Sequence, residues 1–170
     1  RHDRRHHNLV LLEFANKNDI ETVKDYLKTL VEDDVGRFEG NDYCKNATIN
    51  TVLSVYEKKA KEDGVKVNIS ASAGYDIPIS PKDLVIVIAN LFENAINAVK
   101  KLKSDDTIVD VDIREKENRL LVKIENPCKP NLKFDETDYG IGISSVIAVT
   151  NSYEGMYDFT TEDGIFSAKI

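Results

Sequence analysis

The chain carries, at residues 80–103, the stretch SPKDLVIVIANLFENAINAVKKLK, whose periodicity decides the fold. Ser80 is a residue type that caps helices, Pro81 suits the first helical position, and Asp83 follows three residues after the cap. These residue types in this order form a strong helix-start signal. The pattern predicts one helix from Pro81 to about Lys103.

The two faces of this helix differ in chemistry. Asn90, Asn94 and Asn97 fall at i, i+4 and i+7, and Lys101 continues the same stripe. Asparagine is a mediocre helix former, so its repetition along one stripe suggests a functional reason. A carboxamide oxygen is a ligand that Mg²⁺ accepts while it keeps waters and bridges nucleotide phosphates. Periodicity alone favours a merely solvated polar face, so both readings stay open. The opposite face is apolar, with Val85, Ile88, Phe92, Ile96 and Val99.

The segments around this helix predict a mixed sheet that is covered by helices on one face. Alternating apolar residues indicate strands, and turn residues such as Asp163-Gly164 indicate hairpins. The expected elements are a helix at 46–61 that ends at Asp63-Gly64, a strand at 65–70, a hairpin of 108–113 and 119–125, a loop at 127–139, a helix at 140–151, and two final strands.

The first thirty residues follow a separate pattern. Apolar positions step by three and four residues between Ile20 and Leu30, as in a helical bundle, and a second apolar face precedes them. A turn at 16–19, with Asp19 as N-cap, would join the two into a helical hairpin. Because two short helices cannot bury their stripes alone, we predict a homodimer in which two hairpins form a four-helix bundle.

Two glycines among charged residues follow this hairpin and indicate a domain boundary near Glu39. We therefore expect a hairpin domain at 1–38 and a second domain at 39–170. The chain begins at Arg1 without a methionine, and we expect it to be a fragment of a longer protein.

Composition excludes several classes of function. The 23 basic and 30 acidic side chains give a net charge of -7, which is the wrong sign for binding nucleic acid. No run approaches the roughly 18 to 20 apolar residues that cross a bilayer, so no membrane contact is expected in this segment. Cys44 and Cys128 are isolated, which argues against a zinc site or a disulfide and favours a reducing, intracellular setting.

A second candidate site is Gly140-Ile141-Gly142, at the junction of the expected loop and helix. Glycines have no side chain, so their backbone N–H groups can approach a phosphate closely. The positive end of the helix dipole at this place also favours an anion. Glycines at a helix start are more often simple turn residues, and this alternative also stays open.

Together these segments resemble motifs of the GHKL ATPases. Asn90-Leu91-Phe92-Glu93-Asn94-Ala95 is similar to the N box of histidine kinases, and Gly140-Ile141-Gly142-Ile143 resembles the glycine box that follows the ATP lid. Arg1-His2-Asp3, followed by Arg5-His6-His7, resembles the phosphoacceptor box of quorum-type, peptide-sensing histidine kinases. The resemblance covers nearly the whole chain, with the motifs in the family's order.

This resemblance implies an α+β fold, the two-layer α/β sandwich of the GHKL or Bergerat ATP-binding fold, preceded by the dimerising hairpin. It implies that His2 accepts a phosphoryl group and that Asp3 takes or orients its ring proton. Asn94 would be the Mg²⁺ ligand, and Asn90 would contact a phosphate or a metal-bound water. His2, His6 and His7 could also simply form a polar helix end, and His2 and His6 could be i, i+4 metal ligands, but no third ligand is near.

The sequence departs from the family pattern at several positions. Asn126 stands where an aspartate usually binds adenine, and its carbonyl oxygen can still pair with an adenine edge. Asn97 stands where many relatives carry a lysine, which makes Lys101 on the next turn the candidate replacement. The final strands also lack the usual Gly-Thr pair. Asn90 replaces the glutamate of hydrolysing relatives, and since an amide is no general base, phosphoryl transfer is favoured over ATP hydrolysis.

The implied protein is a sensor histidine kinase of a two-component system. It would bind ATP and Mg²⁺, phosphorylate a histidine, and pass the phosphoryl group to an aspartate of a response regulator, of the type with a LytTR DNA-binding domain, in quorum sensing. This fragment would lie in the cytoplasm, with the full-length protein anchored in the cell membrane. The alternatives are a GHKL module that regulates by dimerisation and docking without phosphorylation, and a serine kinase acting as an anti-sigma factor, which needs no His2-Asp3 pair.

Overall fold

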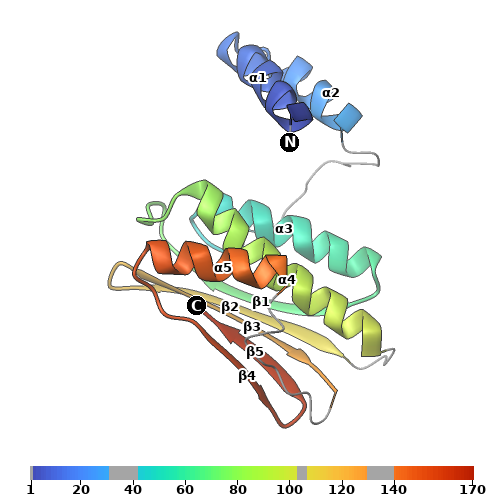
Figure 1. Ribbon diagram of the computed structural model, residues 1–170, viewed down its shortest axis with the longest axis vertical. Coiled ribbons are helices and arrows are strands. Elements are labelled where there is room, and N and C mark those ends of the chain that lie inside the picture. Colours follow the sequence, from blue (N-terminus) through green and yellow to red (C-terminus); the bar gives the residue numbers. More distant parts are fainter. Residues whose placement is uncertain (1, 31–41, 103–106, 130–139) are drawn as a thin grey trace. The chain divides into compact units, whose positions relative to one another are not determined.

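A computed structural model describes residues 2–30, 42–102, 107–129 and 140–170 of the chain. The chain divides into two compact units, residues 1–39 and 40–170, and each is described by itself (Figure 1). None of the helices in the described ranges combines the length and the apolar composition that crossing a bilayer requires.

The first unit contains two helices, α1 (His2–Asn16) and α2 (Ile20–Leu30), that pack on each other. Asp19 caps α2 as expected: the backbone N–H and the hydroxyl of Thr22 donate to its carboxylate at 3.1 and 2.7 Å. The rings of Phe14 and Tyr26 meet edge to face, with centroids 6.1 Å apart. The expected helical hairpin is therefore present in this unit.

The second unit is built on a five-stranded sheet with the order β1-β2-β3-β5-β4. β1 and β2 run parallel, and the other neighbours are antiparallel, so the sheet is mixed as expected. The helix α4 (Pro81–Leu102) lies in the connection between the two parallel strands, because such a pair needs a crossover. The strands are β1 (Lys66–Ser72), β2 (Ile108–Lys116), β3 (Arg119–Pro127), β4 (Asp158–Glu162) and β5 (Ile165–Lys169).

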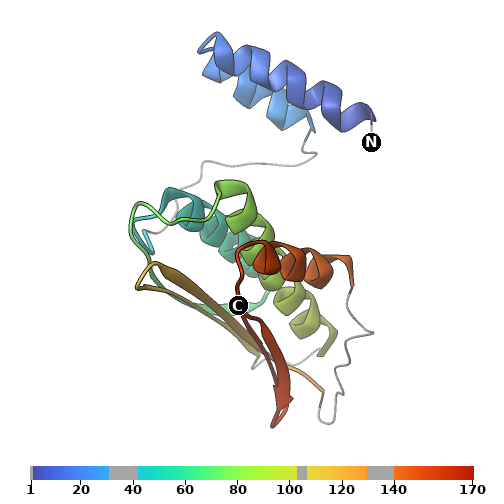
Figure 2. The ribbon, with the colours of Figure 1, turned by 60° about the vertical axis from the view of Figure 1, so that its left-hand side comes forward.

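Three helices cover one face of this sheet, as Figures 1 and 2 show: α3 (Ala47–Glu62), α4 (Pro81–Leu102) and α5 (Ile141–Ser152). Alternate residues of the central strands, such as Val109, Val111 and Ile113, are buried against the helices. Burying one face of a sheet against helices gives two layers, and the expected two-layer α/β sandwich is confirmed.

Local sequence signals place the ends of these elements. The Ser80 hydroxyl accepts from the backbone N–H of Asp83 at 3.2 Å and donates to its carboxylate at 2.8 Å, which begins α4 at Pro81. Gly64, after α3, has a φ of +72°, a conformation that glycine adopts without strain. Asp163 and Gly164 both have positive φ, as a type I′ turn between β4 and β5 requires.

The expected apolar face of α4 is wrong at one position. Val85 is 41% exposed, whereas Leu84 and Val87, which were not part of the expected face, are buried. α4 packs against α3 and α5 as well as the sheet, so its buried arc is set by three neighbours. Periodicity along one helix cannot indicate where those neighbours leave a gap.

Candidate functional site

The candidate site lies where the polar stripe of α4 meets the beginning of α5. α4 buries one side among the sheet, α3 and α5, which leaves its asparagine stripe at the surface. Asn90 is half-buried, while Asn94, Asn97 and Lys101 are exposed. Figure 1 shows the two helices side by side. The stripe is therefore accessible to a ligand beside α5.

Asn90 is held by its own helix. Its Nδ2 donates to the backbone oxygen of Ile86 at 2.7 Å, one turn earlier. This bond fixes the rotamer of the amide and leaves Oδ1 directed away from α4. A β-carbon on Gly142 would stand 2.9 Å from this Oδ1 and 3.6 Å from Nδ2 of Asn94. The fold thus brings Asn90, Asn94 and Gly142 together.

The beginning of α5 has the backbone arrangement of an anion site. Gly140 is the N-cap, with φ -66° and ψ 172°, and has no side chain to cap the helix. The first N–H groups of a helix have no partner within it, and the helix dipole adds partial positive charge there. Ile141 is 90% exposed, so its side chain leaves this end open. Phosphate oxygens are the ligands that such an end favours.

Asn126 occupies the end of β3 and is 3% exposed. Its Nδ2 donates to the backbone oxygen of Pro127 at 2.8 Å. Because this bond uses an amide hydrogen, the side chain can still present its Oδ1 as an acceptor. A buried acceptor in a fixed rotamer suits a ligand that carries an N–H donor.

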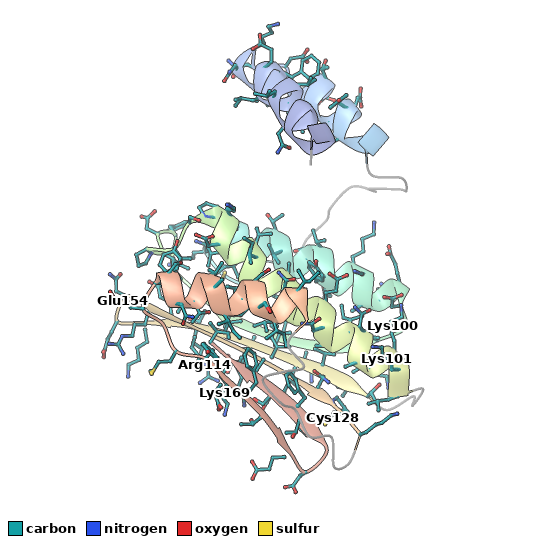
Figure 3. The ribbon with its side chains drawn as sticks, in the orientation of Figure 1. Lys100, Lys101, Arg114, Cys128, Glu154 and Lys169 are labelled. Carbon is teal, nitrogen blue, oxygen red and sulfur yellow. The ribbon has the colours of Figure 1, made fainter. Side chains whose placement is uncertain are left out.

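The other predicted residues are not brought to this cluster by a described contact. Asn97 and Lys101 lie about one and two turns beyond Asn94 on α4. Figure 3 shows Lys101 at the C-terminal end of this helix. His2 and Asp3 belong to α1, in the other unit, and their side chains lie outside the described residues. Of the loop expected at 127–139, residues 130–139 lie outside the described residues.

A metal ion at this site would be bound by amide, phosphate and water oxygens, and not by a cluster of carboxylates. Within the described ranges, no group of three histidine, cysteine, aspartate or glutamate side chains could hold a metal ion. A Mg²⁺ ion that stays bound to phosphates and waters needs only one or two protein oxygens. Asn94 is exposed beside Gly142 and its amide carries one such oxygen, which faces the site after rotation of the side chain because Nδ2 is the Asn94 atom nearest to Gly142.

Sequence reasoning missed the contacts that hold α4 from its other side. Lys59 on α3 pairs with Glu93, and Tyr56 stacks on Phe92. Glu93 lies inside the N-box-like motif, but nothing in the sequence connects it with a lysine 34 residues earlier. Only the packing of α3 on α4 reveals the pair.

The chain resembles known proteins in sequence and in fold. A sequence model of the family described as "GHKL domain" matches residues 79–170. A search of the curated proteins finds no match. Among solved structures, the Acinetobacter baumannii histidine kinase AdeS matches 99% of this chain and 96% of its own, at 16% identity and a TM-score of 0.57.

Two further structures are similar. The catalytic domain of histidine kinase ThkA matches 72% of this chain and 90% of its own, at 16% identity and a TM-score of 0.55. The cytoplasmic segment of histidine kinase QseC matches 89% of this chain and 91% of its own, at 16% identity and a TM-score of 0.51. At this identity the likeness shows a shared fold.

Proposed function

Because the chain belongs to the GHKL domain family, we propose that it is the dimerisation and ATP-binding region of a sensor histidine kinase. The observation that carries this proposal is the meeting of Asn90, Asn94 and Gly142 at the start of α5. It joins two motifs that are far apart in the sequence into one polar surface beside the first N–H groups of α5, which have no partner within the helix. Such a surface suits the phosphates of a nucleotide.

Each residue of this surface receives a distinct role. The oxygen of Asn94 is a ligand of Mg²⁺, and Asn90 contacts a phosphate or a water bound to the metal. The backbone at Gly140 and Gly142 binds phosphate oxygens, with Asn97 and Lys101 as further contacts along α4. Mg²⁺ supplies neutralisation of charge on the phosphates. Asn126 accepts a hydrogen bond from the adenine amino group.

The chemistry we propose is transfer of a phosphoryl group to a histidine. His2 is the acceptor, and Asp3 takes or orients its ring proton. Asn90 cannot activate water as a base, which favours transfer over hydrolysis. Catalysis then comes from the positioning of ATP by α4 and α5. The resemblance at His2 supports a second transfer, to an aspartate of a response regulator of the LytTR type.

The hairpin unit is the dimerisation element of this proposal. Leu9, Leu12, Ile20 and Leu27 are exposed apolar side chains on α1 and α2. A second copy would cover them in a four-helix bundle, which reduces the apolar area in contact with water. By the same resemblance, the complete protein is anchored in the cell membrane, acts in quorum sensing, and has this region in the cytoplasm.

The experiment that tests this function is incubation of the chain with radiolabelled ATP and Mg²⁺, followed by acid and by alkali. Phosphohistidine is lost in acid and survives alkali, so we expect a label with that stability in the wild type and in His7→Gln. The label should vanish in His2→Gln. Label that survives acid would instead support a serine kinase.

The second candidate is a nucleotide-binding regulatory module without kinase activity, which has the same fold and the same nucleotide site. Such a module would bind ATP and form dimers but would give no phosphorylated protein. If the wild type binds ATP but neither the chain nor an added response regulator becomes labelled, this module is the function and the kinase proposal fails.

A further inference from the structure

Two side-chain contacts join α3 to α4 directly beside the asparagines. Nζ of Lys59 lies 2.5 Å from Oε1 of Glu93. One residue earlier on α4, the ring of Phe92 stacks on Tyr56, with centroids 5.7 Å apart and an angle of 24° between the ring planes. Lys59 also lies over the Tyr56 ring, 5.5 Å from its centroid. These four side chains form one contact, called here the α3–α4 clamp.

The clamp is polar at its outer edge and apolar at its inner edge. Phe92 is fully buried, whereas Lys59 and Glu93 each have 42% of their side chain exposed. The hydrogen bond from Lys59 to Glu93 raises the pKa of Lys59. Burial, and then the charge of Glu93, raise the pKa of Tyr56. The Lys59 ammonium therefore stays charged at neutral pH, where it pairs with the Glu93 side chain.

The clamp acts on the part of α4 that carries the candidate site. Phe92 and Glu93 immediately precede Asn94, and Asn90 lies two residues before Phe92. A rotation of α4 by about 10° would move an atom roughly 5 Å from the helix axis by about 1 Å. Misplacing a binding group by about 1 Å can cost up to about a hundredfold in rate. Two contacts at successive residues, which project about 100° apart, resist such a rotation.

We infer that Lys59 and Glu93 are positioning residues, which hold α4 at the rotation where Asn90 and Asn94 face Gly142. This inference rests on the proposed function, because it assigns the pair to the nucleotide site. Neither side chain needs to touch the nucleotide. Their effect passes through the backbone of α4, and it disappears when the pair is broken from either side.

The chain offers a matched control for this pair. Nζ of Lys100 lies 2.6 Å from Oδ1 of Asp63, the residue at the C-terminal end of α3. This ion pair joins the same two helices and is likewise partly exposed, but it lies more than a turn beyond Asn94. Figure 3 shows Lys100 at the C-terminal end of α4. Breaking it should loosen the helices without turning the asparagines.

The first test measures Mg-ATP affinity and melting temperature of Lys59→Met, Glu93→Gln and Lys100→Met. A contact that only stabilises the fold lowers the melting temperature and leaves the affinity of the folded molecules unchanged. We expect Lys59→Met and Glu93→Gln to raise the Kd about two- to fivefold. Lys100→Met should leave it unchanged. The exchanged pair, Lys59→Glu with Glu93→Lys, should restore affinity to within about twofold. Equal affinity in all variants, or an exchanged pair as weak as the single variants, would overturn the inference.

The second test needs no nucleotide and separates this inference from the proposed function. In the ligand-free protein, the NMR signals of the Gly142 backbone amide and the Asn90 side-chain amide report their mutual arrangement. We expect both signals to shift in Lys59→Met and to stay in place in Lys100→Met. If the wild type binds no ATP, the proposed function fails, but these signals still decide the inference. Signals that do not move in Lys59→Met reject it.

Discussion

Oδ1 of Asn90 lies 2.9 Å from the point where a β-carbon on Gly142 would stand. This distance is shorter than ordinary van der Waals contact, and Asn90 cannot swing away freely because its Nδ2 is bonded to Ile86. Gly142 is therefore required by a side chain on another helix, and the packing of α5 on α4 depends on the absence of a side chain there.

Replacing Gly142 by alanine should weaken nucleotide binding. The added methyl would push the Asn90 amide off its hydrogen bond or move α5 outward, so we expect the Kd for Mg-ATP to rise about tenfold or more. Calorimetric titration measures this. Gly140→Ala is the control, since a β-carbon there meets no atom of the described residues within 4 Å and its φ of -66° suits alanine. Equal losses in both variants would contradict the steric explanation.

Asn94→Ala should remove most of the dependence of ATP binding on Mg²⁺. We expect at least about a tenfold loss of affinity with Mg²⁺ present and little change when the metal is removed by a chelator, because the oxygen lost is the proposed metal ligand. Asn97→Ala, on the same stripe one turn farther, should lose much less. A loss that is the same with and without Mg²⁺ would assign Asn94 to the nucleotide instead.

Asn50→Ala should destabilise the second unit. The Asn50 side chain accepts from the backbone N–H groups of Tyr43 and Cys44 at 3.0 and 2.9 Å and donates to the Cys44 oxygen at 2.8 Å. Without these bonds, part-buried backbone groups lose their partners, and we expect the free energy of unfolding to fall by about 1–3 kcal/mol. Urea titration measures it. Asn68→Ala, which removes one exposed bond to Asp110, should change it much less.

Acid should weaken the start of α4. Hydrogen bonds from Ser80 and then from Tyr153 hold the pKa of Asp83 below its ordinary value. Because the pKa of Asp83 is lower in the folded protein, its carboxylate stabilises the fold at any pH above the ordinary pKa of aspartate. This contribution is lost as the pH falls below about 4. The melting temperatures of wild type and Asp83→Asn should thus differ more at pH 7 than at pH 3. An equal difference at both would show that the charge of Asp83 is irrelevant.

A charge placed on the hairpin should separate the proposed dimer. Leu12 is exposed on α1, and a second copy would bury it, so Leu12→Glu should give a monomer in light scattering coupled to gel filtration. Leu121→Glu is the control, since Leu121 is similarly exposed but lies on the sheet of the other unit. A wild type that is already monomeric at micromolar concentration would contradict the four-helix bundle.

Much of the fold could be predicted because its signals are local. A serine followed by proline and an aspartate begins α4, a glycine ends α3, and Asp163-Gly164 turns one strand into the next. Each signal depends on the backbone preferences of a few neighbouring residues, which do not change with the rest of the fold. Val85 was wrong because burial depends on the neighbours that surround a helix.

The candidate site was predictable only as separate pieces. The stripe of Asn90 and Asn94 follows from helical periodicity, and the glycines before α5 were visible as a loop-to-helix junction. Neither pattern contains the distance between them. The partner of Glu93 had no signal at all, since a lysine on an exposed helix face has many equivalent readings.

The sequence by itself determined the helices, the strands, the turns and the presence of an asparagine stripe, because each depends on residues within a few positions of one another. Tertiary structure decided that Asn90 meets Gly142 and that Lys59 meets Glu93. Those pairs depend on how α3, α4 and α5 pack over one sheet. Packing is a property of complementary surfaces that the chain brings together only when the apolar sides of these helices are buried.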